Sequence, residues 1–328
     1  MNRRLAGAFC GLIAASIWGG MYVVSDAVLD VVPPATLVLM RYVIALPVLW
    51  IAARMSHTRG IQRADWSKLA LTAFVGFGVS LLAQFAGTKL STAAAGALIT
   101  SATPAFIVLF AWGILHERAS GRQWMGLGIA TIGVLIVSLL GVQSASETAT
   151  NPLLGNLLLI VAAVSWALYS VLVKVNSQKY TALAITLVVT ALGIPMVAPV
   201  AAIELQTQSI GTLTLPAIMG ILYIGIGATA IAFFLWNKSF ELLDAATASL
   251  FFFAQPMVGT LLSAVFLGEK LGWSFFVGGA LILAGALLGM LTPSLLADRL
   301  IGEKRPAIKS PTDESAPDPR DVALGKSS

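Results

Sequence analysis

The chain has 328 residues, of which 58% are hydrophobic and only 11% are charged, and its formal net charge is +5. Soluble domains average about 45–50% apolar and about 25% charged residues, so this composition excludes a water-soluble protein of this length. One cysteine and two histidines exclude an internal disulfide and a histidine-cysteine metal cluster. No cofactor is expected.

A helix needs about 20 apolar residues to cross a membrane, and ten stretches of the sequence come close to this length. They are predicted as transmembrane helices at Leu5–Ser25, Ala35–Ala53, Leu69–Thr88, Leu90–Leu115, Gln123–Val142, Pro152–Val173, Thr181–Ile203, Leu215–Trp236, Ala245–Gly268 and Gly272–Thr292. The first is too polar at its far end for a cleaved signal peptide. The predicted fold class is an all-α integral membrane protein with ten transmembrane helices.

The positions of Lys and Arg predict the orientation of these helices, because basic residues are retained on the cytoplasmic side. With the N-terminus inside, seventeen of the 20 basic residues lie in cytoplasmic segments, only Lys89 and Lys270 lie in outer loops, and Arg41 lies within a span. Both termini are therefore predicted to be cytoplasmic, in the cell inner membrane. Lipid is an expected partner, whereas nucleic acid is not, because the basic residues form no stripe.

The second half of the chain aligns with the first at offsets of 148 and 152 residues. The matched positions are Ala14–Trp18 with Ala162–Trp166, Pro104 with Pro256, Glu117-Arg118 with Glu269-Lys270, Gly126 with Gly278, and Gly133 with Gly285. Each predicted repeat, residues 1–145 and 146–295, has five helices, so the second must be inverted in the membrane. Inverted repeats are typical of secondary transporters with a midplane substrate site and alternating access. Residues 296–328 are predicted to be a disordered cytoplasmic tail.

Several motifs resemble those of a known family. They are Ile17-Trp18-Gly19-Gly20, Pro34 to Arg41-Tyr42, Thr103-Pro104, Gln255-Pro256, His116-Glu117-Arg118, Gly268-Glu269-Lys270 and the glycine-spaced last helix of each half. Over about residues 5–292 the chain resembles the EamA-type drug/metabolite transporter superfamily. This resemblance implies a ten-helix basket that exports amino acids, metabolites or drugs. Asp26 departs from the family pattern, because relatives often carry a lysine there.

Two tryptophans that the repeat matches lie deep within predicted helices. Trp18 has Tyr22 on the same helix face at i+4, and Trp166 has Tyr169 at i+3. They are candidate walls of a central cavity that stack on an amphipathic substrate; ordinary helix packing is the alternative. The other six tryptophans lie near predicted span ends, where interfacial belts are expected: Trp50, Trp66, Trp112, Trp124, Trp236 and Trp273.

Prolines in the fourth and ninth predicted helices are candidate hinges, with a static kink as the alternative. Pro104 and Pro256 each remove a hydrogen bond and free carbonyls one turn earlier, near Thr100-Ser101 and Phe252-Phe253. Polar side chains within spans need partners in the protein or a ligand. The candidate substrate-binding residues of this kind are Gln84, Thr100, Thr103 and Gln255.

Arg41 is the one formal charge well inside a predicted span, where exposure to lipid costs at least about 2.5–3.5 kcal/mol. It is either a structural or outer-gate residue, snorkelling to the surface or binding helix-end carbonyls, or a ligand of a substrate carboxylate. The pairs Glu117-Arg118 and Glu269-Lys270 stand at matching ends of the fourth and ninth helices. They are candidate latches of two gates, with solvated helix ends as the alternative.

The sequence favours a secondary-active or facilitative exporter of small amphipathic metabolites, foremost hydrophobic or aromatic amino acids, as a monomer or homodimer. It has no Walker motif for direct ATP drive and no Asp or Glu in the middle of a span for a proton relay, so ion coupling and uniport both stay open. Phosphorylated substrates would need several buried basic groups. A drug-efflux carrier is the rival transporter, and a membrane receptor or enzyme is the alternative of another class.

Overall fold

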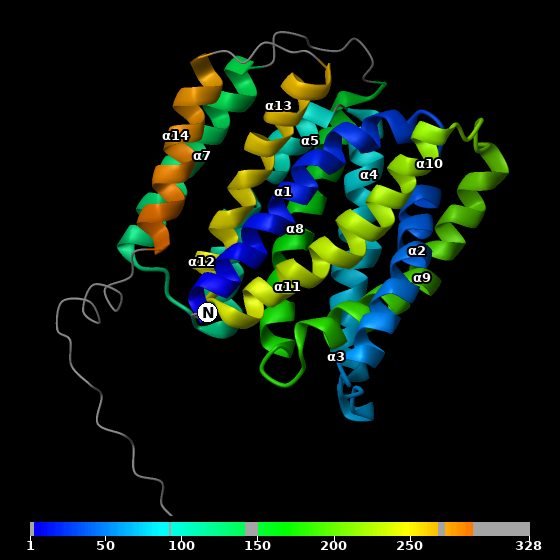
Figure 1. Cartoon of the computed structure of the whole chain (residues 1–328), viewed down its shortest axis with the longest axis horizontal. Coiled ribbons are helices and arrows are strands. Elements are labelled where there is room, and N and C mark those ends of the chain that lie inside the picture. The colour runs from blue at the N-terminus through cyan, green and yellow to red at the C-terminus, as the bar shows by residue number, and fades with distance from the viewer. Residues whose placement is uncertain (1–2, 92, 142–149, 268–272, 291–328) are drawn as a thin grey trace, which may run out of the picture. The chain divides into compact units, whose positions relative to one another are not determined.

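The computed structural model describes residues 3–91, 93–141, 150–267 and 273–290, and every regular element in these ranges is helical (Figure 1). In chain order they are α1 (Arg3–Leu29), α2 (Pro34–Met55), η1 (Arg63–Asp65), α3 (Trp66–Ala73), η2 (Phe74–Ser80), α4 (Leu81–Leu90), α5 (Ala93–Thr100), α6 (Thr103–Phe110), η3 (Ala111–Leu115), α7 (Gly121–Gly141), α8 (Pro152–Asn176), α9 (Ala182–Thr207), α10 (Leu215–Leu222), η4 (Tyr223–Ile231), α11 (Ala232–Leu242), α12 (Ala245–Leu250), η5 (Phe251–Phe253), α13 (Ala254–Leu267) and α14 (Trp273–Met290). The all-α prediction is confirmed. The predicted tail, residues 296–328, lies outside the described ranges.

Six helical stretches of the described chain are long and apolar enough to cross a membrane. They are α1, α2, the stretch from η1 to α4, α8, α9 and the stretch from α10 to α11. The other predicted spans are helical over most of their length, as α5 to η3, α7, α12 to α13 and α14. The protein is therefore a multi-pass membrane protein, while ten crossings and the orientation of the termini stay predictions.

Large apolar side chains cover the outside of the described helices. Met55, Leu153 and Phe276 expose 76%, 75% and 64% of their surface. Soluble monomers rarely expose large contiguous apolar patches, whereas hydrocarbon solvates such side chains without cost. The outer surface therefore fits the membrane environment that the composition predicts.

The face on which α1 begins, which we call the N face, also carries several later connections. A Cβ atom at Gly7 would lie 2.6 Å from Leu243 Cγ, so the first turns of α1 lie against the connection after α11. Lys174 Nζ, at the end of α8, donates to Leu243 O. Glu117 Oε2, after η3, accepts from Ala245 N at 2.9 Å. The ends of η3, α8 and α11 therefore share this face with the start of α1.

The ends of α1, α4 and α9 meet on the opposite face. Lys89 Nζ, in the last turn of α4, donates to Leu29 O at 2.9 Å. Gly211 N, which follows α9, donates to Val31 O at 2.8 Å. Successive connections thus alternate between the two faces, which is the arrangement that crossing helices require.

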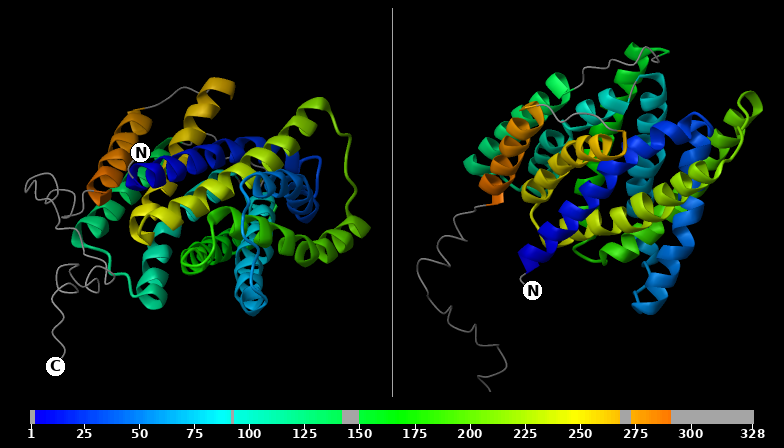
Figure 2. Two further views of the ribbon diagram at one scale, coloured as in Figure 1. Left: turned by 60° about the horizontal axis from the view of Figure 1, so that its bottom comes forward. Right: turned by 45° about the horizontal axis from the view of Figure 1, so that its top comes forward.

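The principal helix pairs join the first half of the chain to the second. α1 packs against α11 and α13, α8 packs against α4 and α6, α2 packs against α9, and α7 packs against α14. Figures 1 and 2 show the last pair, α7 in green and α14 in orange, side by side. The pairs are symmetric between the two halves. If α1 is exchanged with α8, α4 with α11 and α6 with α13, the same set of pairs results.

Two predicted helices are interrupted beside their prolines. α5 ends at Thr100 and α6 begins at Thr103, one residue before Pro104. In the second case α12 gives way to the 3-10 turn η5 before α13, which contains Pro256. Proline lacks the N–H donor and crowds the carbonyl of the preceding turn, so both interruptions fall where the sequence predicts them.

Two further helices widen into π-helical segments, η2 and η4, and each segment contains a Gly-x-Gly pair. A Cβ atom at Gly76 of η2 would lie 2.3 Å from Tyr169 Cδ2, and one at Gly225 of η4 would lie 2.6 Å from Ile44 Cγ2. The missing side chains let α8 and α2 approach these wide turns. Such π segments are frequent at functional sites, because they change which carbonyls are available to side chains.

Glycines also set the distance between α7 and α14. A Cβ atom at Gly126 would lie 2.4 Å from Gly285 O, and one at Gly133 would lie 2.5 Å from Gly278 O. Backbone meets backbone at both positions, so nothing flexible is present to make room. The two helices are held by close backbone approach, as is common in membranes.

We predict that Gly126→Ala lowers the midpoint of thermal unfolding of the detergent-purified protein, because the added methyl group must push α14 away. The expected cost is about 1–3 kcal/mol. Gly128→Ala is the matched control: it lies on the same helix, with no atom within 4 Å of its Cβ position, and should leave the midpoint unchanged or raise it. Equal midpoints for the two variants would contradict the packing described for α7 and α14.

Candidate functional site

A buried cavity between α1, α2, α4, α8 and α13 brings together residues from both halves of the chain. Seven of the predicted site residues line it: Trp18, Arg41, Gln84, Thr100, Thr103, Trp166 and Gln255. Its free volume is about 30 Å³, which is room for about one or two water molecules. An amino acid is much larger, so the lining helices must separate before such a substrate enters.

Aromatic rings close the cavity toward the N face. The ring centroid of Trp18 lies 5.4 Å from that of Trp166 and 5.3 Å from that of Trp236, and Trp236 lies 5.0 Å from Phe240 near the end of α11. The prediction that Trp236 belongs to an interfacial belt is wrong. The helix continues to Leu242, beyond the predicted end, so Trp236 is fully buried and donates from Nε1 to Ser170 Oγ at 3.0 Å.

A narrow hollow extends from the cavity toward the opposite face, between α1 and α4. Its walls are Met21, Ser25, Leu29, Gln84, Phe85 and Thr88, of which Met21 and Gln84 also line the cavity. The hollow has no room for a water molecule. The cavity is therefore flanked by aromatic rings toward the N face and by a narrow seam toward the opposite face.

The π segment η4 positions two of the cavity residues. Arg41 Nε donates to Thr229 Oγ1 at 2.7 Å, Arg41 Nη2 donates to Ala228 O at 3.2 Å, and Trp18 Nε1 donates to the same carbonyl at 2.9 Å. Arg41 is 0% exposed, so snorkelling to the surface, one of the alternatives for this residue, does not occur. Its acceptors lie at its own depth in the bundle, because η4 presents them there.

Unsatisfied polar atoms are concentrated around the cavity. Six buried side-chain atoms of the described residues lack a hydrogen-bond partner, and four of them belong to cavity residues: Arg41 Nη1, Thr103 Oγ1, Trp166 Nε1 and Gln255 Oε1. A buried polar atom without a partner costs about 1–3 kcal/mol. A polar ligand in the cavity would supply the missing partners, so the site can bind donors and acceptors as well as apolar surface.

The structure does not bring every predicted site residue to the cavity. Tyr169 stacks on Trp166 with ring centroids 4.6 Å apart, and its hydroxyl donates to Asn237 Oδ1 at 3.0 Å, so it supports the wall from behind. The side chain of Tyr22 lies outside the described part of the chain. The predicted hinge residues Pro104 and Pro256 do not line the cavity but lie next to Thr103 and Gln255, which do.

The predicted latch pair at the end of η3 does not form an internal ion pair. Glu117 instead accepts the backbone N–H of Ala245 at 2.9 Å and so binds the start of α12, where the helix dipole favours a negative charge. Arg118 is exposed. The matched pair, Glu269 and Lys270, lies outside the described residues.

Several lining residues were not singled out in the sequence. They are Met21, Ser80, Leu81, Ala162, Ala163, Phe233 and Phe252. Apolar residues that face a cavity have the same composition as those that face another helix, so periodicity does not distinguish them. One signal was present: the Gly-x-Gly pairs at Gly76 and Gly225 recur at matching places in the two halves and mark the π segments beside the cavity.

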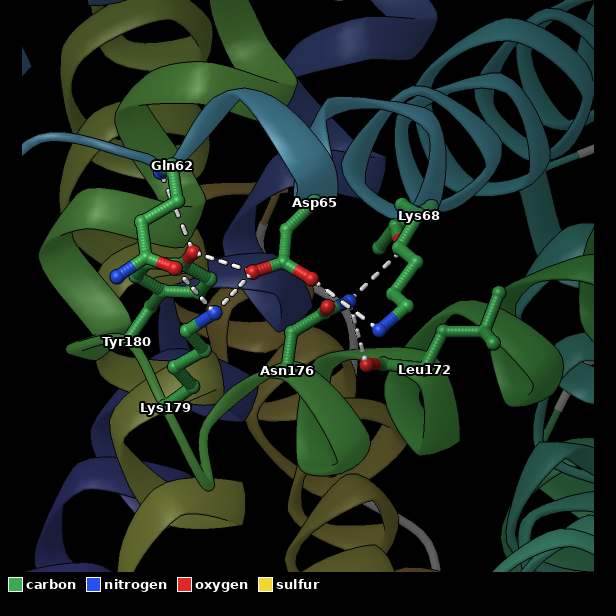
Figure 3. A network of polar contacts seen from close by, with 8 residues as sticks. Gln62, Asp65, Lys68, Leu172, Asn176, Lys179 and Tyr180 are labelled. Carbon is green, nitrogen blue, oxygen red and sulfur yellow. Dashed lines mark hydrogen bonds and ion pairs between the residues drawn. The ribbon is translucent and has the colours of Figure 1, made fainter.

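A polar network ties two N-face connections together (Figure 3). The Asp65 carboxylate accepts from Lys179 Nζ at 2.5 Å, from Tyr180 OH at 2.7 Å and from Lys68 Nζ at 3.1 Å. Lys179 Nζ also donates to Gln62 Oε1 at 2.7 Å. The hydrogen bond from Lys179 to the Asp65 carboxylate raises the pKa of the Lys179 ammonium. The segment before α3 is thereby joined to the segment before α9.

A second carboxylate makes a comparable contact on the opposite face. Glu204, near the end of α9, accepts the backbone N–H groups of Ala35 and Thr36 at 3.0 and 2.8 Å. These are free donors in the first turn of α2, where the helix dipole also favours a carboxylate. Each face therefore has an acidic residue that joins the first half of the chain to the second.

Comparison with known proteins identifies relatives along most of the chain. The sequence profile of the EamA-like transporter family matches residues 5–139 and 153–291. The uncharacterized transporter YetK of Bacillus subtilis is 26% identical over 293 residues, which cover 88% of each chain. A probable amino-acid metabolite efflux pump of Salmonella typhimurium is 27% identical over 299 residues, covering 86% of this chain and 94% of the pump.

The fold also matches a solved structure. A protein known by its crystal structure superposes with a TM-score of 0.72 over 90% of this chain and 99% of its own, at 22% identity. The two proteins therefore share one arrangement of helices at low sequence identity.

We predict that Asp65→Asn lowers the thermal unfolding midpoint, because Lys68 and Lys179 lose their common counter-charge and Tyr180 loses a charged acceptor. Asp30→Asn is the matched control, since Asp30 forms an ion pair with Lys89 but its side chain is 78% exposed and screened by water. Thermal unfolding of both variants in detergent measures the difference. Midpoint decreases of equal size would show that the Asp65 network adds no more to stability than the exposed Asp30–Lys89 pair does.

Proposed function

The chain belongs to the EamA-like transporter family, and from that premise we propose that it exports small amphipathic metabolites, foremost hydrophobic or aromatic amino acids. The observation that carries the proposal is the composition of the cavity. Aromatic rings form one wall, and Arg41, Thr103, Trp166 and Gln255 each present a polar atom without a partner. An amino acid with an apolar side chain offers both kinds of surface in one small molecule.

The named relatives support a transporter and, in one case, this substrate class. The pump of Salmonella typhimurium is described as a probable amino-acid metabolite efflux pump, whereas YetK is described only as a transporter. Efflux of cationic drugs is the rival function. It is disfavoured because Arg41 is the only charged residue among the described residues that line the cavity, and a buried guanidinium repels a cation.

Alternating access between two inverted repeats is part of the proposal. The family profile matches two successive segments of similar length, and the helix pairs map onto themselves when the halves are exchanged. Interruptions beside Pro104 and Pro256 supply places where α5 and α12 can change direction relative to α6 and α13. Aromatic rings on one side of the cavity and a narrow seam on the other fit a cycle in which either side opens in turn.

The orientation of the cycle follows from the basic residues. The positive-inside rule places the N face in the cytoplasm of a bacterial-type inner membrane, so the rings of Trp18, Trp166 and Trp236 lie on the cytoplasmic side of the cavity. Substrate would enter when these rings separate. It would leave along the seam between α1 and α4, toward the opposite face.

The function is tested by flux of radiolabelled phenylalanine and tryptophan into proteoliposomes. We expect uptake above that of empty liposomes, and we expect Trp18→Ala and Trp166→Ala to lower it at least about tenfold, since each removes aromatic contact area with substrate. Trp112→Ala is the control, because Trp112 is 60% exposed on the outer surface and should leave flux unchanged. If no amino acid shows flux above that of empty liposomes, the proposed function is overturned.

Wild-type flux in both folded cavity variants would instead remove the aromatic wall from the mechanism while leaving the transporter assignment in place. Monodisperse elution from a size-exclusion column shows that each variant is folded.

A further inference from the structure

The charge of Arg41 has no counter-charge within the described residues. Its two hydrogen-bonded nitrogens contact the neutral acceptors Thr229 Oγ1 and Ala228 O. The ion pairs that the described carboxylates form involve Lys68, Lys89, Lys179 and Lys238, all outside the cavity. A guanidinium stays protonated in proteins, so among the described residues the cavity carries one positive charge with no opposite charge paired to it.

The guanidinium of Arg41 is also held in a fixed orientation. The rings of Phe85 and Phe233 lie 5.1 and 5.3 Å from its central carbon, within the range of cation–π attraction. Two hydrogen bonds to η4 restrain the same group. Nη1 is left without a partner, although it is buried and belongs to a residue that lines the cavity.

We propose that Arg41 is the carboxylate anchor of the transport site and that a carboxylate, rather than an ammonium, is the group that every substrate must carry. This inference rests on the proposed function and names the chemistry of its substrate. A carboxylate accepts from guanidinium N–H groups in short, charge-assisted hydrogen bonds. Thr103 Oγ1 and Trp166 Nε1 are two further unpartnered groups that can donate to it.

A purely structural role explains why Nε and Nη2 of Arg41 are hydrogen-bonded. It does not explain why Nη1 is buried without a partner. Fixing α2 to η4 requires only the bonds to Thr229 and Ala228, and such bonds do not require a charged donor. Burial of a charged donor without an acceptor is expensive. The arrangement becomes favourable when an anion occupies the cavity, because the same donor then gains a charged partner.

The charge balance also limits which anions fit. Arg41 is the single charged residue among the described lining residues, so it neutralises one carboxylate but not a phosphate dianion or a dicarboxylate. Among the unpartnered buried atoms of the described residues, Gln255 Oε1 is the one that can only accept. It can take a hydrogen bond from a substrate ammonium, and this contact is secondary because it involves no opposite charge.

Three phenyl compounds of nearly equal size separate these contributions in the wild-type protein. Phenylalanine carries both groups, 3-phenylpropionate carries only the carboxylate, and phenethylamine carries only the ammonium. Binding is measured by the change in intrinsic tryptophan fluorescence, since Trp18 and Trp166 line the cavity, and by isothermal titration calorimetry. We expect phenylalanine and 3-phenylpropionate to bind about 10- to 100-fold more tightly than phenethylamine, the effect of one charge-assisted hydrogen bond.

Variants of Arg41 test the residue itself. Arg41→Met and Arg41→Gln should reduce the preference for 3-phenylpropionate over phenethylamine to about threefold or less, while Arg41→Lys should retain part of it because the positive charge remains. Arg54→Met is the matched control: Arg54 is exposed near the end of the same helix, with its guanidinium 5.0 Å from the Trp50 ring, and should keep the wild-type preference.

The outcomes are distinguishable. Equal binding of phenethylamine and 3-phenylpropionate by the wild type overturns the carboxylate anchor while leaving an amino-acid transporter possible. Retention of the wild-type preference in folded Arg41→Met overturns the role of Arg41. If no Arg41 variant elutes as a folded species, the wild-type ligand series decides the question alone. Failure of every amino acid to bind or move contradicts the proposed function itself.

Discussion

Within hydrocarbon, every backbone N–H and C=O group needs a partner inside the protein, so a helix can depart from regular geometry only where other protein groups or a cavity receive the freed atoms. The interruptions of this structure obey that constraint. The breaks beside Pro104 and Pro256 and the π segment η2 border the cavity, and the π segment η4 binds two of its lining residues. The carbonyl of Ala228 in η4 accepts from both Trp18 and Arg41, so irregular backbone and site geometry have the same origin.

Close packing of helices away from the cavity holds the bundle together around these irregular segments. Backbone contacts at Gly126 and Gly133 hold α7 against α14 without side chains between them. Carboxylates bind free backbone donors or basic groups at the helix ends: Glu117 at α12, Glu204 at α2, and Asp65 at Lys179. Contacts of this kind leave the ends of the bundle well defined, while the middle retains a small cavity and unpartnered polar atoms.

The chain has few charged residues, so a charged group that is buried has a large electrostatic effect on its surroundings. A guanidinium at the surface is screened by water and salt, whereas Arg41 is fully buried between two phenylalanine rings. Among the described residues that line the cavity, Arg41 is the only charged one. Selection among small aromatic molecules can then depend on the charge of the substrate, since the aromatic walls accept any ring of the right size.

The sequence by itself determined the all-α membrane character, the approximate limits of the helices and the places where two prolines interrupt them, because these depend on local composition and on the missing N–H of proline. It also singled out seven residues that the structure gathers around one cavity, since a tryptophan, arginine or glutamine deep in an apolar helix stands out against its neighbours. Snorkelling, one of the alternatives left open for Arg41, does not occur, and the interfacial place expected for Trp236 is wrong.

Only the tertiary structure decided what those side chains contact. Arg41 stays buried because η4, nearly 190 residues later in the chain, presents a hydroxyl and a carbonyl at its depth, and Trp236 is buried because α11 runs past its predicted end. Tyr169 lies behind Trp166 rather than beside the cavity, since Gly76 of η2 leaves space for its ring. Such long-range contacts depend on how distant helices approach one another, and local sequence patterns do not encode that distance.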